Sequence, residues 1–194
     1  MPWFRQSTLE PLAVSMSGIK LGDRLLIVGC ADTVLIAALA AKSGLTGRAC
    51  MVCRSAEERV RAADAVEQQG VLVESFDAPP AALPFDDETF DVAVIRNVLP
   101  DLDAESRTNY VAEVRRVLRQ GGRCMVIDDA PRRGIGALLG SGGRPDREFA
   151  DSGGAAKVLT AAGFRGVRTL ARRQALVFVE GVRPNTDPHP SSPA

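Results

Sequence analysis

The sequence predicts a single α/β domain with a mostly parallel seven-stranded sheet, helices on both faces and an antiparallel hairpin at the C-terminal end. Three observations predict this class. Short apolar runs alternate with helical patterns, several of these runs are apolar throughout, as in strands buried on both faces, and no helix separates the last two runs. A length of 194 residues with 45% hydrophobic residues suits one domain with a sizeable core. We expect this domain to span residues 21–182, between an N-terminal segment of residues 1–20 and a disordered tail of residues 183–194.

The first strand and helix follow the N-terminal segment. Residues 24–30 are a short apolar run, which predicts a strand buried on both faces. Residues 34–43 predict an almost wholly apolar helix, because Asp32 or Thr33 can cap its N-terminus and Gly44 follows its end. A strand followed directly by a helix is the beginning of a βαβ unit.

A second strand, a helix and a third strand come next. Residues 49–53 predict the second strand, and residues 71–76 predict the third. Between them, Ser55 and Glu58 have the spacing of a capping box, which predicts a helix that runs to about Gln69. The positions expected on the inner face of this helix are Val60, Ala63 and Val66.

A longer helix separates the fourth and fifth strands. Residues 90–95 and 123–128 predict these two strands. Asp103 can cap a helix between them, and Gly121 and Gly122 would end it. Its apolar positions recur at helical spacing: Tyr110, Val111, Val114, Val117 and Leu118.

The C-terminal third begins with a segment of a different composition. Residues 131–143 are rich in Gly and Arg without apolar periodicity, which predicts a mobile loop or lid. Residues 155–162 then predict a helix that Gly163 ends. Residues 167–171 and 175–181 predict two strands that pair antiparallel, since no helix connects them.

Scarce residue types exclude several kinds of chemistry. The only histidine, His189, lies in the tail, so His-dependent nucleophilic catalysis and His-ligated metal sites lack a key residue, and we expect no metal site. The only tyrosine, Tyr110, has no lysine four residues later, which excludes the catalytic pair of short-chain dehydrogenases. The acidic run at residues 86–88 suits a solvated turn before a strand better than a metal cluster.

Charge and hydropathy limit the partners and location that we expect. Basic and acidic residues both number 24, so overall charge does not favour nucleic acid or a membrane surface. Positive charge is concentrated in residues 115–173. These arginines either are solvated or lie at a helix end, or they form a surface for an anionic substrate or RNA. Aromatic residues that could stack on bases are scarce, which favours solvated and helix-end arginines. The longest apolar run, residues 33–41, is too short to cross a membrane, and no secretory signal is visible. We therefore expect a cytoplasmic protein.

Two of the four cysteines form a C-x-x-C pattern. Cys50 and Cys53 lie in the second strand, where residues three apart point to opposite faces. A redox pair of this type needs a helix N-terminus instead. We therefore expect buried structural cysteines and, in a cytosolic protein, no disulfide.

Four sequence segments match motifs of one known family and occur in the same order. They are residues 21–30 (LGDRLLIVGC), 83–94 (LPFDDETFDVAV), 114–123 (VRRVLRQGGR) and 161–164 (AAGF). Together they resemble the class I S-adenosylmethionine-dependent methyltransferases, most closely the branch of the ubiquinone and menaquinone methyltransferases. The resemblance covers about residues 20–182 and implies a Rossmann-like methyltransferase fold.

The glycine-rich motif of this family is degenerate in the chain. The family has an acid and three glycines at the places that here hold Ile27, Gly29, Ala31 and Thr33. It also places an acid for the ribose hydroxyls of the cofactor at the end of the second strand, where this chain has Cys53. Asp77 and Ala78 stand where the family contacts the adenine.

The resemblance therefore implies a site for S-adenosylmethionine at the carboxyl ends of the strands. The residues expected at this site are Gly29, Ala31, Cys53, Asp77, Ala78 and Arg96.

Two functions are consistent with these observations. One is a methyltransferase for an unknown small molecule whose degenerate donor site has become weak or been lost, and the other is a non-catalytic scaffold or regulator that keeps the fold for a protein partner. A dinucleotide enzyme fits less well, because residues 29–34 keep one of three glycines. The lack of histidine does not exclude methyl transfer, since a sulfonium methyl is already activated. Asp128, Asp129 or Arg96 could assist an acceptor that must lose a proton.

Overall fold

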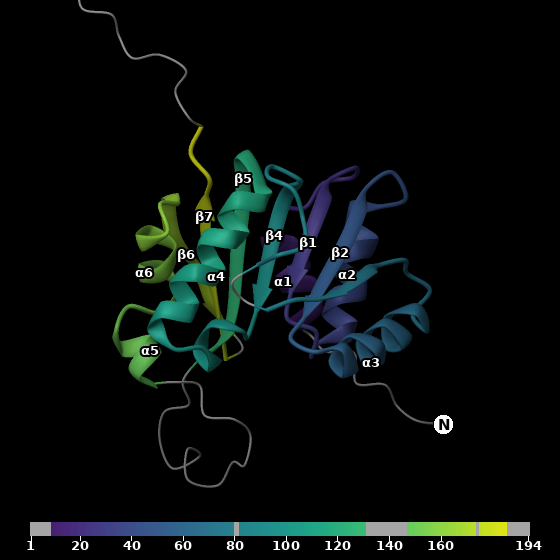
Figure 1. Ribbon diagram of the computed structural model, residues 1–194, viewed down its shortest axis with the longest axis horizontal. Coiled ribbons are helices and arrows are strands. Elements are labelled where there is room, and N and C mark those ends of the chain that lie inside the picture. The colour runs from purple at the N-terminus through teal and green to yellow at the C-terminus, as the bar shows by residue number, and fades with distance from the viewer. Residues whose placement is uncertain (1–8, 80–81, 131–146, 174, 186–194) are drawn as a thin grey trace, which may run out of the picture.

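The computed structural model describes residues 9–79, 82–130, 147–173 and 175–185. These residues form one seven-stranded sheet in the order β3-β2-β1-β4-β5-β7-β6 (Figure 1). The strands are β1 (Arg24–Val28), β2 (Arg48–Cys53), β3 (Glu74–Asp77), β4 (Phe90–Arg96), β5 (Leu118–Asp129), β6 (Arg165–Arg173) and β7 (Leu176–Val182). The first five pair in parallel, and β7 pairs antiparallel with both β5 and β6. The predicted fold class and C-terminal hairpin are confirmed.

Helices cover both faces of the sheet (Figure 1). They are α1 (Leu9–Ser17), α2 (Thr33–Ser43), α3 (Ala56–Glu67), the short 3-10 helix η1 (Leu99–Asp101), α4 (Ala104–Val117), α5 (Arg147–Asp151) and α6 (Gly154–Ala161). Successive residues of β1 point to opposite faces. Leu26 and Val28 belong to the core under α4, α5 and α6, whereas Leu25 and Ile27 belong to the core under α1, α2 and α3.

Two helices were not expected from the sequence. Helix α1 lies in the predicted N-terminal segment, where Ala13 is buried in the core beside α2. Pro11 lies in its first turn, where a missing backbone N–H costs little. The five-residue helix α5 places Phe149 in the opposite core.

The inner face of α3 differs from the prediction. Ala62 and Val66 are buried, one helical turn apart, whereas Val60 is 49% exposed. The predicted inner position Val60 is therefore wrong. The small side chain of Ala62 packs in the core next to the sheet, whereas the side chain of Val60 faces solvent.

Helix α4 ends earlier than its sequence predicts. It stops at Val117, and Leu118 is already extended and buried in β5, so Gly121 and Gly122 do not end the helix. The Arg183 guanidinium donates hydrogen bonds to the carbonyl oxygens of Arg115 (3.0 Å), Arg116 (2.8 Å) and Leu118, and it pairs with Glu88 at 3.0 Å. A side chain beyond β7 thus satisfies carbonyl groups that a glycine cap would otherwise serve.

Several sequence expectations lie outside the described residues. These are the Gly/Arg-rich lid at residues 131–143 and the tail with His189. Among the helices of the described part of the chain, none has the length and hydropathy of a membrane-spanning segment.

Candidate functional site

A pocket of about 660 Å³ opens at the carboxyl ends of β1 and β4. These neighbours mark the point where the strand order reverses, which is where open α/β sheets bind ligands. The volume lies in the usual range of small-molecule sites. The wall is formed by Gly29–Val34, Arg54, Glu58, Arg61, Ala62 and Arg96–Val98.

Gly29 brings the tip of β1 close to β4. Its φ is +96°, and a Cβ at this position would lie 2.5 Å from the carbonyl oxygen of Arg96 and 2.8 Å from Val98 Cγ2. Its backbone N–H donates to the carbonyl oxygen of Val52 at 3.1 Å. Only glycine fits this turn, because a side chain would meet both strain and backbone.

Ala31 and Asp32 continue the wall from Gly29 to α2. The three described non-glycine residues with positive φ are Glu88, Asn97 and Ala175, so Ala31 carries no left-handed strain. The Asp32 carboxylate accepts a hydrogen bond from the Leu35 N–H at 3.1 Å and so caps α2, as predicted. The N-terminus of α2 therefore opens onto the pocket, with its partial positive charge toward any ligand there.

Arg96 and Asn97 form the opposite wall at the end of β4. The Arg96 side chain is 14% exposed, and it lies 3.0 Å from a carboxylate oxygen of Asp129 and 3.8 Å from one of Asp32. Asn97 has a left-handed φ of +50°, and its side-chain oxygen accepts the Asp129 N–H at 2.8 Å. The predicted site residues Gly29, Ala31 and Arg96 thus share one pocket.

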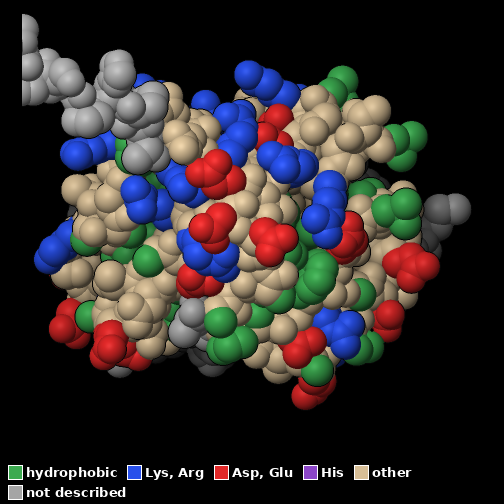
Figure 2. All heavy atoms as spheres, turned by 45° about the horizontal axis from the view of Figure 1, so that its top comes forward, with side chains coloured by type: hydrophobic (Ala, Val, Ile, Leu, Met, Phe, Trp, Pro, Cys, Tyr) green, Lys and Arg blue, Asp and Glu red, His purple; other side chains and the backbone are tan. Residues whose placement is uncertain are grey.

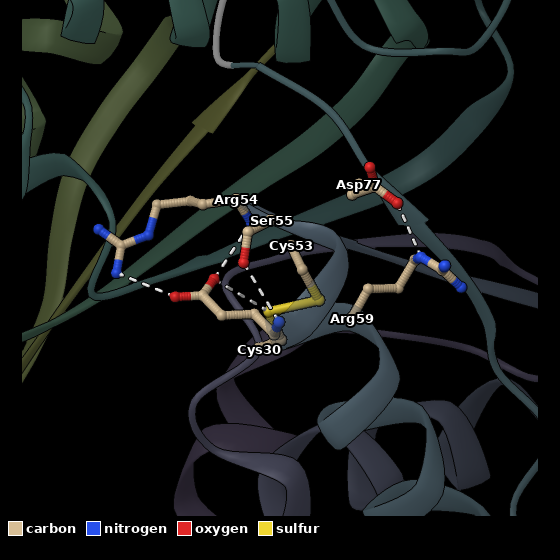
Figure 3. Close-up of a disulfide and its surroundings, with 7 residues drawn as sticks. Cys30, Cys53, Arg54, Ser55, Arg59 and Asp77 are labelled. Atoms are coloured by element: carbon tan, nitrogen blue, oxygen red, sulfur yellow. Dashed lines mark hydrogen bonds and ion pairs between the residues drawn. A yellow bond between two sulfur atoms is a disulfide. The ribbon is translucent and has the colours of Figure 1, made fainter.

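Cys53 does not line the pocket; it is buried beneath it and forms a disulfide with Cys30 (Figure 3). The expectation of no disulfide is therefore wrong. The parallel register places Val28 opposite Val52, so the chain just beyond β1 meets the end of β2, and the two Cα atoms are 5.6 Å apart. Cys50 and Cys53 point into opposite cores, as predicted, and Cys50 and Cys124 are buried and free.

Asp77 and Ala78 lie outside the pocket wall, at the end of β3. The Asp77 carboxylate pairs with the Arg59 Nε at 2.7 Å, away from the disulfide (Figure 3). Ala78 is buried, and its N–H donates to the carbonyl oxygen of Cys53 at 3.2 Å. The structure does not bring these two predicted residues to the wall that Gly29 and Arg96 form.

Glu58 is a pocket residue that the sequence indicated only as a helix cap. Ser55 accepts the Glu58 N–H at 3.2 Å, as the capping box predicts. The Glu58 carboxylate, however, accepts the Arg54 N–H at 3.2 Å and lies 3.5 Å from the Arg54 guanidinium. It also lines the pocket. The signal that could have identified it is its place in the first turn of the helix that directly follows β2.

Asp128 is a buried carboxyl group beside this pocket. One of its side-chain oxygens is buried without a hydrogen-bond partner. Burial raises the pKa of Asp128 to about 7, against the lowering effect of Arg96. Together with Asp129, Phe149 and Arg172 it lines a second cavity of about 80 Å³.

Other acidic residues have structural partners at the opposite edge of the sheet. Asp91 accepts the Arg24 N–H at 2.8 Å and pairs with Arg119 at 2.5 Å, and these hydrogen bonds lower its pKa against the opposing effect of burial. Figure 2 turns this amino-terminal edge forward and shows Lys and Arg interspersed with Asp and Glu. Within the described residues, no three His, Cys, Asp or Glu side chains are grouped to hold a metal ion.

The acidic turn before β4 also engages arginines. Asp87 pairs with Arg116 at 2.7 Å, and Glu88, whose φ is +58°, pairs with Arg183. Arg116 further pairs with Glu113 at 2.9 Å. Arg116, in the positively charged segment, and Arg183, beyond β7, therefore hold the turn and the end of α4 in place.

Solved structures similar to this chain carry methyltransferase names and one other activity. A SAM-dependent methyltransferase from Aquifex aeolicus is 20% identical with a TM-score of 0.74, over 89% of this chain and 88% of that chain. The [4+2]-cyclase SpnF is 19% identical with a TM-score of 0.69, over 92% and 80%. A geranyl diphosphate methyltransferase, solved with GPP and sinefungin, is 14% identical with a TM-score of 0.62, over 90% and 78%. At these identities the likeness concerns the fold.

A comparison with curated protein sequences finds no match. The family described as "Methyltransferase domain" matches residues 26–126, which is more than half of the 194-residue chain. This match runs from β1 into β5 and includes the residues of the pocket, and so the chain belongs to this methyltransferase domain family.

Proposed function

We propose that this protein is a methyltransferase that binds S-adenosylmethionine weakly in the pocket at the ends of β1 and β4 and methylates a small molecule. The observation that supports this proposal most is the pocket itself. It lies at the switch point of a methyltransferase-domain sheet, and a glycine that no other residue can replace forms its turn.

The charges of the pocket wall suit the donor. Arg54, Arg61 and Arg96 offer cations to a carboxylate, and Asp32 and Glu58 offer acceptors to an ammonium group or to ribose hydroxyls. When bound, S-adenosylmethionine supplies a methyl group already activated by its sulfonium charge. The chain's part is therefore to hold and align the donor and to exclude water.

Glu58 takes the place of the missing ribose acid in this proposal. Cys53, at the end of β2, is buried and bonded to Cys30, so it offers no carboxylate to the pocket. Glu58 lies further along the chain in the first turn of α3, and two contacts with Arg54 hold its carboxylate at the wall. A hydrogen bond to a charged group contributes about 1.5–3 kcal/mol, so this substitute decides whether binding is measurable.

We assign Asp128 the role of general base for a methyl-accepting substrate that must lose a proton. Its pKa of about 7 leaves a large ionised fraction at neutral pH, as a general base requires. One Asp128 oxygen has no hydrogen-bond partner and the adjoining cavity offers space. A methyl-accepting substrate in this cavity could therefore donate a hydrogen bond to that oxygen.

A non-catalytic scaffold for a protein partner is the second candidate. The cyclase SpnF shows that this fold serves functions other than the one in the family's name. In either case we propose a cytoplasmic protein without a nucleic-acid or membrane partner. The zero net charge of the chain and the mixture of charges on its amino-terminal edge (Figure 2) support the absence of such a partner.

Calorimetry with S-adenosylmethionine and S-adenosylhomocysteine separates the two candidates. We expect saturable binding below millimolar concentration, about tenfold weaker binding by Glu58→Gln, and unchanged binding by Glu67→Gln, which alters an exposed carboxylate at the far end of α3. Absence of saturable binding at millimolar ligand would favour the scaffold. In that case, binding gained by a Cys53→Asp, Ala31→Gly double variant would locate the loss in the degenerate motif.

A further inference from the structure

The disulfide joins the tips of two neighbouring parallel strands. Cys30 lies just beyond β1, Cys53 ends β2 at a sequence separation of 23, and the segment between them includes α2. The Gly29 N–H donates to the Val52 carbonyl oxygen directly beside the two cysteines. Because this backbone contact does not involve sulfur, it holds the two cysteines close to each other after reduction as well.

The two sulfur atoms differ in access. Cys30 is partly exposed and forms part of the pocket wall, whereas Cys53 is 1% exposed and packed in the core under α2 and α3. Thiol–disulfide exchange requires a thiolate to approach one sulfur directly. A thiolate from solvent therefore reaches Cys30 through the pocket, and Cys53 is the sulfur that leaves.

A hydrogen-bond acceptor is in place for the reduced form. Glu58 Oε2 lies 3.9 Å from Cys30 Sγ, within the distance of a sulfur hydrogen bond. A disulfide sulfur has no hydrogen to donate, so this bond exists only when Cys30 is a thiol. The contacts that Glu58 makes with Arg54 do not involve sulfur, so they do not depend on the disulfide. The surroundings thus accommodate the thiol as well as the disulfide.

We propose that Cys30 and Cys53 form a thiol–disulfide exchange site that small thiols reach through the donor pocket, so that exchange at Cys30 and donor binding exclude each other. The exclusion rests on the proposed function, and the exchange does not. In a cytoplasmic protein, such a pair would act as a redox-responsive group, since lasting disulfides are rare there.

The exchange is balanced with a small dithiol as reductant. Its thiolate attacks Cys30 Sγ, the Cys30–Cys53 bond breaks, and Cys53 leaves as a thiolate that takes up a proton. The second sulfur of the dithiol then attacks the mixed disulfide, closes the oxidised cyclic reductant and releases Cys30 as a thiolate, which is protonated in turn. Two electrons pass from the dithiol to the protein. A small disulfide such as glutathione disulfide reverses the process, and its mixed disulfide on Cys30 would occupy the pocket.

Single-cysteine variants test the difference in access. Treated with glutathione disulfide in the folded state, Cys53→Ser should react at Cys30 at least about tenfold faster than Cys30→Ser reacts at Cys53. Cys50 and Cys124 serve as internal controls, because they are buried and burial raises the pKa of their thiols to about 11 and about 12. Equal rates at Cys30 and Cys53 would overturn the proposal.

The wild-type protein gives the same answer without a substitution. Cleavage after Arg and Lys separates Cys30, in residues 25–42, from Cys53, in residues 49–54. After partial reoxidation with glutathione disulfide, the mixed disulfide should be found by mass spectrometry on the first peptide. The second peptide also contains Cys50, so fragment ions assign any mixed disulfide there, and its presence mainly on Cys53 would contradict the inference.

Competition with ligand completes the test. Reduction of the disulfide by dithiothreitol should slow about tenfold when S-adenosylhomocysteine occupies about nine-tenths of the pockets. If calorimetry shows binding and the rate does not change, the exclusion is wrong and the proposed function stands. If no ligand binds, the proposed function fails, and the difference in access between Cys30 and Cys53 still decides whether the exchange site exists.

Discussion

The Arg96 guanidinium lies 3.0 Å from the Asp129 carboxylate, and this ion pair joins one residue from the wall of each of two cavities at the carboxyl edge of the sheet. Arg96 lines the larger pocket, and Asp129 lines the smaller one beside Asp128. The ion pair therefore links the wall of the proposed donor pocket to the wall of the cavity beside Asp128. The arrangement makes Arg96 the residue whose loss should affect both cavities.

Replacing Arg96 with methionine should weaken binding of S-adenosylhomocysteine about tenfold, or by about 1.4 kcal/mol. The change removes a cation from the wall and leaves the carboxylates of Asp32 and Asp129 without their shared partner. Calorimetry measures the effect, with Arg165→Met on the exposed start of β6 as the matched control. Equal affinity in the two variants would show that Arg96 has no part in the site.

Replacing Asn97 with alanine should destabilise the protein more than replacing it with glycine. Alanine loses the hydrogen bond from the Asp129 N–H and keeps a Cβ at a φ of +50°, whereas glycine loses only the hydrogen bond. We expect Asn97→Ala to lower the free energy of unfolding by about 2–3 kcal/mol and Asn97→Gly by about 1 kcal/mol. Urea unfolding measures both. Equal losses would mean that the left-handed backbone at this position is not strained.

Gly29→Ala should destabilise the protein more than Gly70→Ala. Both glycines have positive φ, +96° and +75°, so alanine is strained at either one. At Gly29 the added Cβ also meets the Arg96 carbonyl oxygen at 2.5 Å, whereas at Gly70 no atom lies within 4 Å. We expect a loss of about 1 kcal/mol at Gly70 and at least twice that at Gly29, measured by thermal unfolding. A larger loss at Gly70 would contradict the close packing of β1 against β4.

Asp128 should make stability depend on pH between about 4 and 7. Burial raises the pKa of Asp128 to about 7, so the folded state retains a proton that the unfolded chain, with an ordinary pKa of about 3.9, releases. This contribution to stability is complete below about pH 4 and is lost as the pH rises through 7. Asp128→Asn cannot ionise, so its stability relative to wild type should increase across this range, by on the order of 2–4 kcal/mol.

Chemical unfolding of both proteins at several pH values measures this difference. A constant difference from pH 4 to pH 8 would show that the carboxyl group titrates alike in the folded and unfolded states.

The sheet could be predicted because its signals are local. The apolar runs of β1, β2 and β4 and the caps Asp32, Ser55 and Asp103 act within a few residues, and each has the predicted role in the structure. The end of α4 could not be predicted in this way. It depends on Arg183, which is more than 60 residues away from the carbonyl groups that it binds.

The candidate site was predicted in part for the same reason. Gly29, Ala31 and Arg96 follow strands that meet at the switch point, so topology alone brings them together. The Cys30–Cys53 pair depends on the register of β1 against β2, which the sequence does not specify directly. The unpaired oxygen of Asp128 depends on packing around β5.

The contacts of Arg183 have a practical consequence for where the chain can be shortened. A fragment that stops at Val182 contains every strand but lacks Arg183. The carbonyl groups at the end of α4 would then lose their hydrogen bonds from the Arg183 guanidinium, and Glu88 would lose its ion pair. A fragment that extends to Asn185 keeps these contacts of Arg183. Fusion partners, affinity tags and crystallisation truncations are therefore best joined beyond that residue.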